Sequence, residues 1–301
     1  MGFRDITKIV VFLALLLAIF FPEPASFLTD YLMIILIVML SISIKSLGPE
    51  HLDIKKKEFV AVLVIVNTFV LSALYIIFSH LLITDELYRN ALIIYGLMPP
   101  AIGIVSLGYL YHVDMKVDMY AEFLGYALSL VVIPVGTYVF MRTTVAPVDI
   151  LEIIVLLLII PMLLSRFIRR AKLSDDTLKT MISVCFGIVI FTIVGSNLET
   201  IIENLQDVVN IMIVLIILRI FLMIAIFMIA RKFLSHQNSV LLTLFGTMKN
   251  GAAATAISIM LLGVESTVPL ALEALFFTGG LFIMDYMFRR YDTGIEEKSN
   301  G

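Results

Sequence analysis

The sequence has few of the residues from which soluble catalytic and metal sites are built. Charged residues make up only 15% of the 301 residues, against about 25% in an average soluble domain. Cys185 is the single cysteine and the four histidines lie far apart, so we expect neither a disulfide framework nor a Cys/His metal site. There is no HExxH, phosphate-loop or GxSxG motif, and no aspartate pair of the intramembrane-protease type. We therefore do not expect an enzyme.

Apolar residues dominate instead, at 61% of the chain and a mean hydropathy of +1.07. A run of about 20 apolar residues crosses a bilayer. The runs predict ten spans, at 8–21, 27–46, 58–82, 88–112, 117–140, 148–167, 180–197, 207–230, 238–262 and 267–288. The first span is short and follows Arg4 and Lys8, so it also fits a signal peptide. The remaining residues suffice only for short loops and tails, and we expect the function to lie within the bilayer.

The distribution of charge supports this topology. The net charge of −3 is too small to indicate a nucleic-acid partner. With the N-terminus inside, 17 of the 21 lysines and arginines fall in alternate segments, as the positive-inside rule requires. Arg89 and Arg142 lie outside, and Arg219 and Lys249 fall within spans. The pattern predicts a multi-pass protein of the plasma membrane with both termini in the cytoplasm.

An internal repeat emerges when the halves are overlaid at an offset of 150 residues. GLMPPAIGIVS, from Gly96, then meets GTMKNGAAATA, from Gly246. Each half holds five spans, an odd number, so the halves enter the membrane from opposite sides, as in many secondary transporters. We expect an all-α integral membrane protein with two inverted five-helix repeats, at 1–143 and 144–291, and a cytoplasmic tail at 292–301.

Two of the predicted spans are interrupted at equivalent places. Pro99-Pro100 removes two backbone donors from the fourth span, and Lys249-Asn250-Gly251 interrupts the ninth. Irregular backbone at membrane depth is tolerated only inside protein or beside a wet cavity, so paired breaks predict a midplane site, with ordinary kinks as the alternative. The candidate substrate- or ion-binding residues are Pro99, Pro100, Thr247, Lys249, Asn250 and Gly251, together with Asn67 of the third span and Glu273 of the last.

Lys249 is the most informative candidate, because a charge at the centre of a span costs about 2.5–3.5 kcal/mol on insertion scales. Beside the N-termini of two half-helices it could hold an anion such as a carboxylate. Two alternatives stay open. Lys249 could bind and release a proton during a transport cycle, or it could form a structural ion pair.

Arg219 is the second buried cation, and we expect it to form a structural pair with Glu122, Glu273 or Asp285. Glu122 and Asp285 lie near the cytoplasmic ends of their spans and are expected to reach water. Glu273 is therefore the favoured functional acid. Asn67 is uncharged, and such side chains more often bond a neighbouring helix than a ligand.

The ninth and tenth spans, FGTMKNGAAATAISIMLLGVESTVPLALEALFF, resemble the bile acid:sodium symporter family, whose second crossing helix carries Met-Gln-Asn before small residues. The fourth and fifth spans resemble the first crossing helix of that family. They resemble equally the auxin efflux carriers of the same bile/arsenite/riboflavin transporter superfamily. The resemblance implies ten spans, two inverted repeats and broken, crossing helices 4 and 9.

The departures from the family pattern concern the sodium ligands. Phe245 stands where the symporters have an acidic ligand, and Lys249 replaces their glutamine. Ile104-Val105 stands in place of a Ser-Asn pair, while Asn67 could remain as a polar ligand. The resemblance thus implies degraded sodium sites, and our hypothesis is that the Lys249 ammonium takes the place of the cation.

These observations predict a secondary active transporter, or a facilitated carrier, of a small organic anion that works by alternating access. A proton is the expected coupling ion, sodium is less expected, and no other cofactor is. The alternatives are a sodium-coupled organic anion symporter, an auxin-efflux-type carrier, a cation/proton antiporter, and a receptor or structural protein. A homo-oligomer stays open, because the small residues Gly103, Gly108 and Gly251 serve intramolecular packing as readily as dimer contacts.

Overall fold

The computed structural model describes residues 3–44, 56–101, 103–141, 160–170 and 174–292, and these residues form helices and no strand. The sixth predicted span lies largely outside them, as do the boundary between the predicted halves and nearly all of the predicted tail. Four of the helical stretches are long and apolar enough to cross a membrane, at Lys57–Leu82, Met115–Phe140, Leu205–Ala230 and Val264–Tyr291. A fifth span results if the bent pair Phe12–Phe20 and Glu23–Thr29 is counted as one. The all-α membrane class is therefore confirmed for the described residues.

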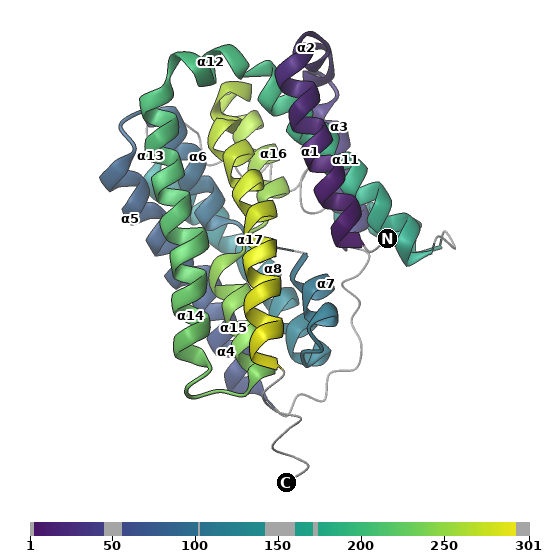
Figure 1. Cartoon of the computed structure of the whole chain (residues 1–301), viewed down its shortest axis with the longest axis vertical. Coiled ribbons are helices and arrows are strands. Elements are labelled where there is room, and N and C mark those ends of the chain that lie inside the picture. The colour runs from purple at the N-terminus through teal and green to yellow at the C-terminus, as the bar shows by residue number, and fades with distance from the viewer. Residues whose placement is uncertain (1–2, 45–55, 102, 142–159, 171–173, 293–301) are drawn as a thin grey trace.

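One group of helices stands to one side of the molecule (Figure 1). It consists of α1 (Phe3–Phe20), α2 (Glu23–Thr29), α3 (Leu32–Ile44), α10 (Ile160–Arg170) and α11 (Asp175–Ser196). Helix α11 packs against α1, α2 and α3, and α10 packs against α3. Residues from distant parts of the sequence thus form one unit, which we call the outer group. The short helix α12 (Leu198–Glu203) leads from it across one end of the molecule.

The remaining helices form a second unit, which we call the crossing group. Its first part is α4 (Lys57–Ile65), η1 (Val66–Leu71), α5 (Ser72–Leu82), α6 (Glu86–Leu97), α7 (Gly103–Leu110) and α8 (Met115–Phe140). Its second part is α13 (Leu205–Leu215), η3 (Ile216–Phe221), α14 (Leu222–Ala230), α15 (His236–Thr247), α16 (Gly251–Leu262), η4 (Val264–Thr267) and α17 (Val268–Asp292). The order of the main helices recurs at an offset of about 150 residues.

The closest correspondence concerns two wide, π-helical turns. η1 interrupts the helix 57–82 and η3 interrupts the helix 205–230, and the two turns lie 150 residues apart. Such turns are rare and occur often at functional sites. Both turns carry buried polar side chains, Asn67 and Thr68 on η1 and Arg219 on η3. The offset of 150 residues therefore also relates two local irregularities of the backbone.

Large apolar side chains cover much of the outer surface. The most exposed include Phe20, Leu81, Phe167 and Phe233, each at 65% or more. A soluble monomer rarely leaves apolar patches of such extent uncovered. The buried core, in contrast, contains Asn67, Arg219 and Lys249 among its aromatic and aliphatic residues. Apolar residues outside and selected polar residues inside are the arrangement that a lipid environment favours.

Candidate functional site

The two broken helices meet at their breaks. Helix α6 ends at Leu97 because Met98 turns to an extended conformation and the next two residues are prolines. Helix α15 ends at Thr247, and Met248 is likewise extended. Pro100 and Lys249 form an antiparallel bridge, in which the Asn250 N–H donates to the Pro99 carbonyl at 2.9 Å. The structure thus brings Pro99, Pro100, Lys249 and Asn250 together.

Asn250 fixes the start of the helix beyond the crossing. Its Oδ1 accepts from the Ala253 N–H at 3.1 Å and so caps α16. Its Nδ2 donates to the Tyr126 hydroxyl at 2.6 Å, which ties the crossing to α8. One amide side chain therefore connects the crossing, the first turn of α16 and the helix that packs behind it.

Lys249 is buried, with 3% of its surface exposed, and its ammonium faces oxygen atoms. Nζ donates to the Met98 carbonyl at 2.8 Å and to the Ser72 hydroxyl at 3.2 Å. Within the described residues no carboxylate lies within 4 Å of Nζ. The ammonium thus stands at the C-terminal end of α6, where the helix dipole and the freed carbonyls favour a cation. Lys249 therefore forms no structural ion pair with the described residues, which was one of the alternatives for its role.

Asn67 plays the corresponding part at the other break. Its Nδ2 donates to the carbonyls of Phe245 and Met248, at 2.7 and 3.0 Å. Met98 and Met248 lie 150 residues apart, and the freed carbonyl of each break accepts from a side chain far away in the sequence. Asn67 thus bonds a neighbouring helix, as is usual for such a side chain, and this helix is α15, which ends at the second break.

Arg219 and Glu273 form the buried ion pair beside the crossing. The distance from NH2 to Oε1 is 2.8 Å, and Glu273 is therefore the partner among the three candidate acids. The same carboxylate oxygen accepts from the Tyr95 hydroxyl at 2.7 Å. Arg219 also donates to the Thr247 carbonyl, at the end of α15. Glu273, the favoured functional acid, is thus held by two donors through Oε1.

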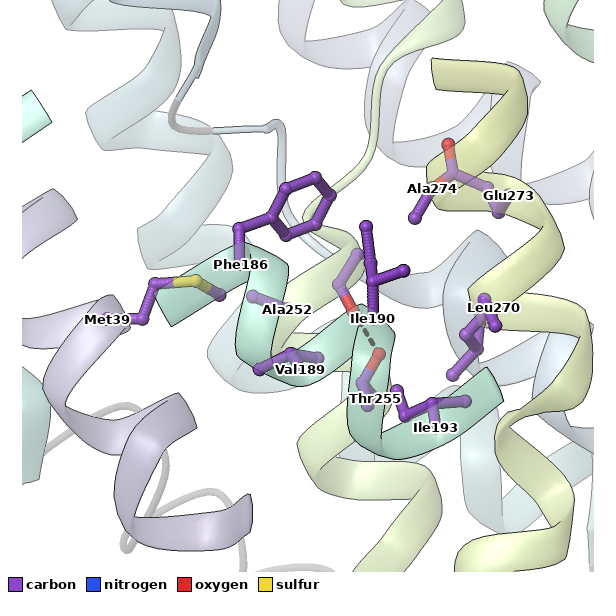
Figure 2. Close-up of a pocket in the computed structure, with 12 residues that line it drawn as sticks. Met39, Phe186, Val189, Ile190, Ile193, Ala252, Thr255, Leu270, Glu273 and Ala274 are labelled. Carbon is purple, nitrogen blue, oxygen red and sulfur yellow. Dashed lines mark hydrogen bonds between the residues drawn. The ribbon is translucent and has the colours of Figure 1, made fainter. Parts of the chain in front are cut away.

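A small pocket lies between the two helix groups, next to this ion pair (Figure 2). The outer group contributes Met39 of α3 and four residues of α11, Phe186, Val189, Ile190 and Ile193. The crossing group contributes Gly251, Ala252 and Thr255 of α16 and Leu270, Ala271, Glu273 and Ala274 of α17. The cavity is small in this conformation, with a volume of about 20 Å³. The pocket is mostly apolar, with Glu273 and Thr255 as polar groups.

Two of the candidates have structural roles near the pocket. Thr247 is buried and its hydroxyl donates back to the Thr243 carbonyl at 2.7 Å. Gly251 begins α16, and a Cβ at this position would lie 3.2 Å from Glu273 Oε2. Gly251 therefore permits the approach of α17 to the start of α16.

One expectation about the acidic residues is wrong. Instead of reaching water near the end of its span, Glu122 is fully buried, as is Asp118 one turn earlier on α8. Asp285 does lie near the surface, and it pairs with Arg289 at 2.8 Å. Sequence reasoning does not single out Asp118, Ser72, Tyr95 or Tyr126. The sequence does contain one pattern that could have indicated two of them, because Asp118, Glu122 and Tyr126 are spaced four residues apart and so share one helix face.

No protein-family model matches the chain, and no curated protein matches it either.

Proposed function

We propose that the chain is a secondary transporter, or a facilitated carrier, of a small organic anion, which works by alternating access in the plasma membrane. The observation that carries the proposal is the crossing of α6 and α15, at which two interrupted helices expose backbone groups within an apolar protein. Discontinuous helices that meet at the centre of the membrane form the binding sites of many secondary carriers. A receptor or a purely structural protein has no need of such a crossing.

The proposed architecture is ten spans in two inverted repeats. It is supported by the offset of 150 residues that relates η1 to η3 and α6 to α15. It is supported also by the reciprocal bonds of Lys249 to the first break and of Asn67 to the second. The alternation of positive charge along the sequence gives the orientation, with both termini in the cytoplasm.

We propose that Lys249 acts as a fixed cation at the crossing. In ion-coupled carriers, unwound carbonyls and the C-terminal ends of half-helices coordinate sodium. Here the ammonium occupies that kind of position, with the Met98 carbonyl and the Ser72 hydroxyl as acceptors. A tethered charge does not dissociate, so transport would not require sodium, and a proton remains as the coupling ion.

The pocket between the helix groups is the proposed substrate site. Gly251 and Ala252 belong to the first turn of α16, where the helix dipole favours a negative group such as a carboxylate. Met39, Phe186 and Ile190 offer an apolar surface to the rest of the molecule (Figure 2). A relative movement of the outer group and the crossing group would open this boundary to one side of the membrane and then to the other.

The test is thermal unfolding of the purified protein with benzoate, octanoate and pyruvate, each in sodium and in choline salts. A ligand at 100 times its dissociation constant stabilises a protein by about 2.7 kcal/mol. We expect one carboxylate to raise the melting temperature equally in both salts. Ala252→Phe should abolish the shift by filling the pocket, whereas Met260→Phe, on the exposed face of the same helix, should retain it.

Uptake of the same carboxylate into proteoliposomes completes the test. Accumulation that needs a sodium gradient would replace the proposal by a sodium-coupled symporter. Stabilisation by sodium alone, with no response to any carboxylate, would favour a cation/proton antiporter. Ligand binding without uptake would contradict transport.

A further inference from the structure

Two acidic residues on α8 lie buried without a counter-charge, apart from the ion pair described above. Asp118 and Glu122 are one helical turn apart, and both are 0% exposed. The two Asp118 oxygens have no hydrogen-bond partner within the described part of the chain, and the Glu122 carboxyl group is approached only by the backbone N–H of Val105 on α7. Buried polar atoms are almost always bonded, so two buried carboxyl groups with so few partners on one helix face require an explanation.

Helix α7 is shaped to receive one of these carboxyl groups. A Cβ at Gly108 would lie 2.2 Å from Oδ2 of Asp118, so only glycine leaves room for the carboxyl group at this point. Helix α7 contains no aspartate, glutamate, lysine, arginine or histidine. Asp118 therefore packs closely against a helix that offers it no charged partner.

The other elements that pack against α8 also leave the two acids without a counter-charge. These elements are α4, α6 and η1. Their charged residues are Lys57 and Glu58, exposed at the start of α4, and Glu86 and Arg89, at the end of α6 far from the break. On α8 itself, Lys116 is exposed and Tyr120 is half-buried. Asp114, which caps α8, pairs with Lys56 at 3.3 Å.

The two buried cations of the crossing group are already engaged. Lys249 donates to Met98 and Ser72, and Arg219 pairs with Glu273. An ionised carboxylate buried without a counter-charge is strongly unfavourable. Two of them one turn apart also repel each other. The pair is therefore stable only if protons, or a bound cation, neutralise it.

The same helix face leads directly to the crossing. Tyr126 follows Glu122 by one turn, and its hydroxyl accepts from Asn250 Nδ2 at 2.6 Å. Asn250 caps α16 and bonds the Pro99 carbonyl. A change of charge at the pair thus occurs one turn away from the residue that holds the crossing together.

We propose that Asp118 and Glu122 form the proton-binding site of the carrier. A proton from water at the end of α8 near Asp114 binds to one carboxylate and converts it to a neutral acid. Loss of this proton to the opposite side regenerates the carboxylate and completes the exchange. The role in coupling rests on the proposed transport function, but the occupancy of the pair by a proton does not.

Infrared spectroscopy of the protein in lipid bilayers at neutral pH tests this site, because protonated carboxyl groups give a separate C=O stretching band. We expect the band in the wild type. It should be weaker in Asp118→Asn and in Glu122→Gln and lost in the double variant. Glu58→Gln, which changes an exposed residue of α4, should leave the spectrum unchanged. Circular dichroism and gel filtration establish whether each variant is folded. If the double variant does not fold, the comparison of the two single variants with the wild type is the test.

Two results would overturn the proposal. The first is a protonated-carboxyl band of equal strength in the wild type and in every folded variant of the pair. The second is loss of the wild-type band when sodium replaces choline at constant pH, which would make the pair a cation site. If the band depends on the pair but no organic acid binds, the proton site stands and the transport proposal fails. If an organic acid binds but the band is absent, the proton site fails and the transport proposal stands.

Discussion

Lys249 and Met98, 151 positions apart in the sequence, are joined at the crossing by a hydrogen bond from Nζ to the carbonyl oxygen, 2.8 Å long. The bond places the charge of one half of the chain at the end of a helix of the other half. Because Asn67 makes the reciprocal contact with Met248, the two breaks depend on each other.

Replacement of Lys249 should make the protein sensitive to sodium. Lys249→Met leaves the Met98 carbonyl without its donor, and we expect a loss of about 1–3 kcal/mol of stability. Lys249→Gln retains a donor and should lose less. If the ammonium replaces a cation, sodium chloride should raise the melting temperature of Lys249→Gln but not of the wild type, relative to choline chloride. An identical response of both proteins would contradict the fixed-cation hypothesis.

The pair of Arg219 and Glu273 should show strong energetic coupling. Arg219→Met leaves a buried carboxylate unpaired, and we expect a loss of about 3–5 kcal/mol. The double variant Arg219→Met/Glu273→Met should be less destabilised than the sum of the two single variants. Chemical or thermal unfolding of all four proteins in detergent measures the cycle. Additive losses would show that the two side chains do not stabilise each other.

Asn67 should tolerate a change of charge less well than a loss of the side chain. Asn67→Ala removes the donor to two carbonyls at the second break, at a cost of about 1–3 kcal/mol. Asn67→Asp should cost more, because it places carboxylate oxygens against the Phe245 and Met248 carbonyls. Melting temperatures report the order. Asn210→Ala, on the partly exposed side of α13, is the control and should change little.

Gly125 should be sensitive to the addition of a single methyl group. A Cβ at this position of α8 would lie 2.6 Å from Cγ and Cδ of Pro100, which belongs to the first break. We expect Gly125→Ala to destabilise the protein by about 1–3 kcal/mol through overpacking. Gly279→Ala on α17 is the matched control, because nothing lies within 4 Å of the added atom. Equal melting temperatures of the two variants would contradict the close packing of α8 on the break.

The helical class and the place of both breaks could be predicted from the sequence, because Pro99-Pro100 and Lys249-Asn250 are strong local signals that do not depend on the rest of the fold. Glu273 could also be selected as a possible partner of Arg219, since few ionised groups lie within spans. These features follow from the cost of polar groups in lipid, which is the same whatever the packing.

The remaining features depend on how the helices are turned toward each other. Ser72 lies in an ordinary apolar stretch, and only the position of α5 beside the first break makes it an acceptor for Lys249. The short distance from Glu122 to the loop predicts contact with water, but α8 packs against α4, α6 and α7, and Glu122 is fully buried. The turns η1 and η3, VNTFVL and IILRIF, share no sequence pattern that predicts a wide turn.

The reciprocal bonds at the crossing have a consequence for the synthesis of the protein. Until Lys249 and Asn250 have been synthesised, the carbonyls of Met98 and Pro99 lack the donors that these two residues supply. Each such group costs several kcal/mol in lipid. Hydrogen bonding at the first break can therefore be completed only after a segment about 150 residues further along the chain has been synthesised and has packed against it.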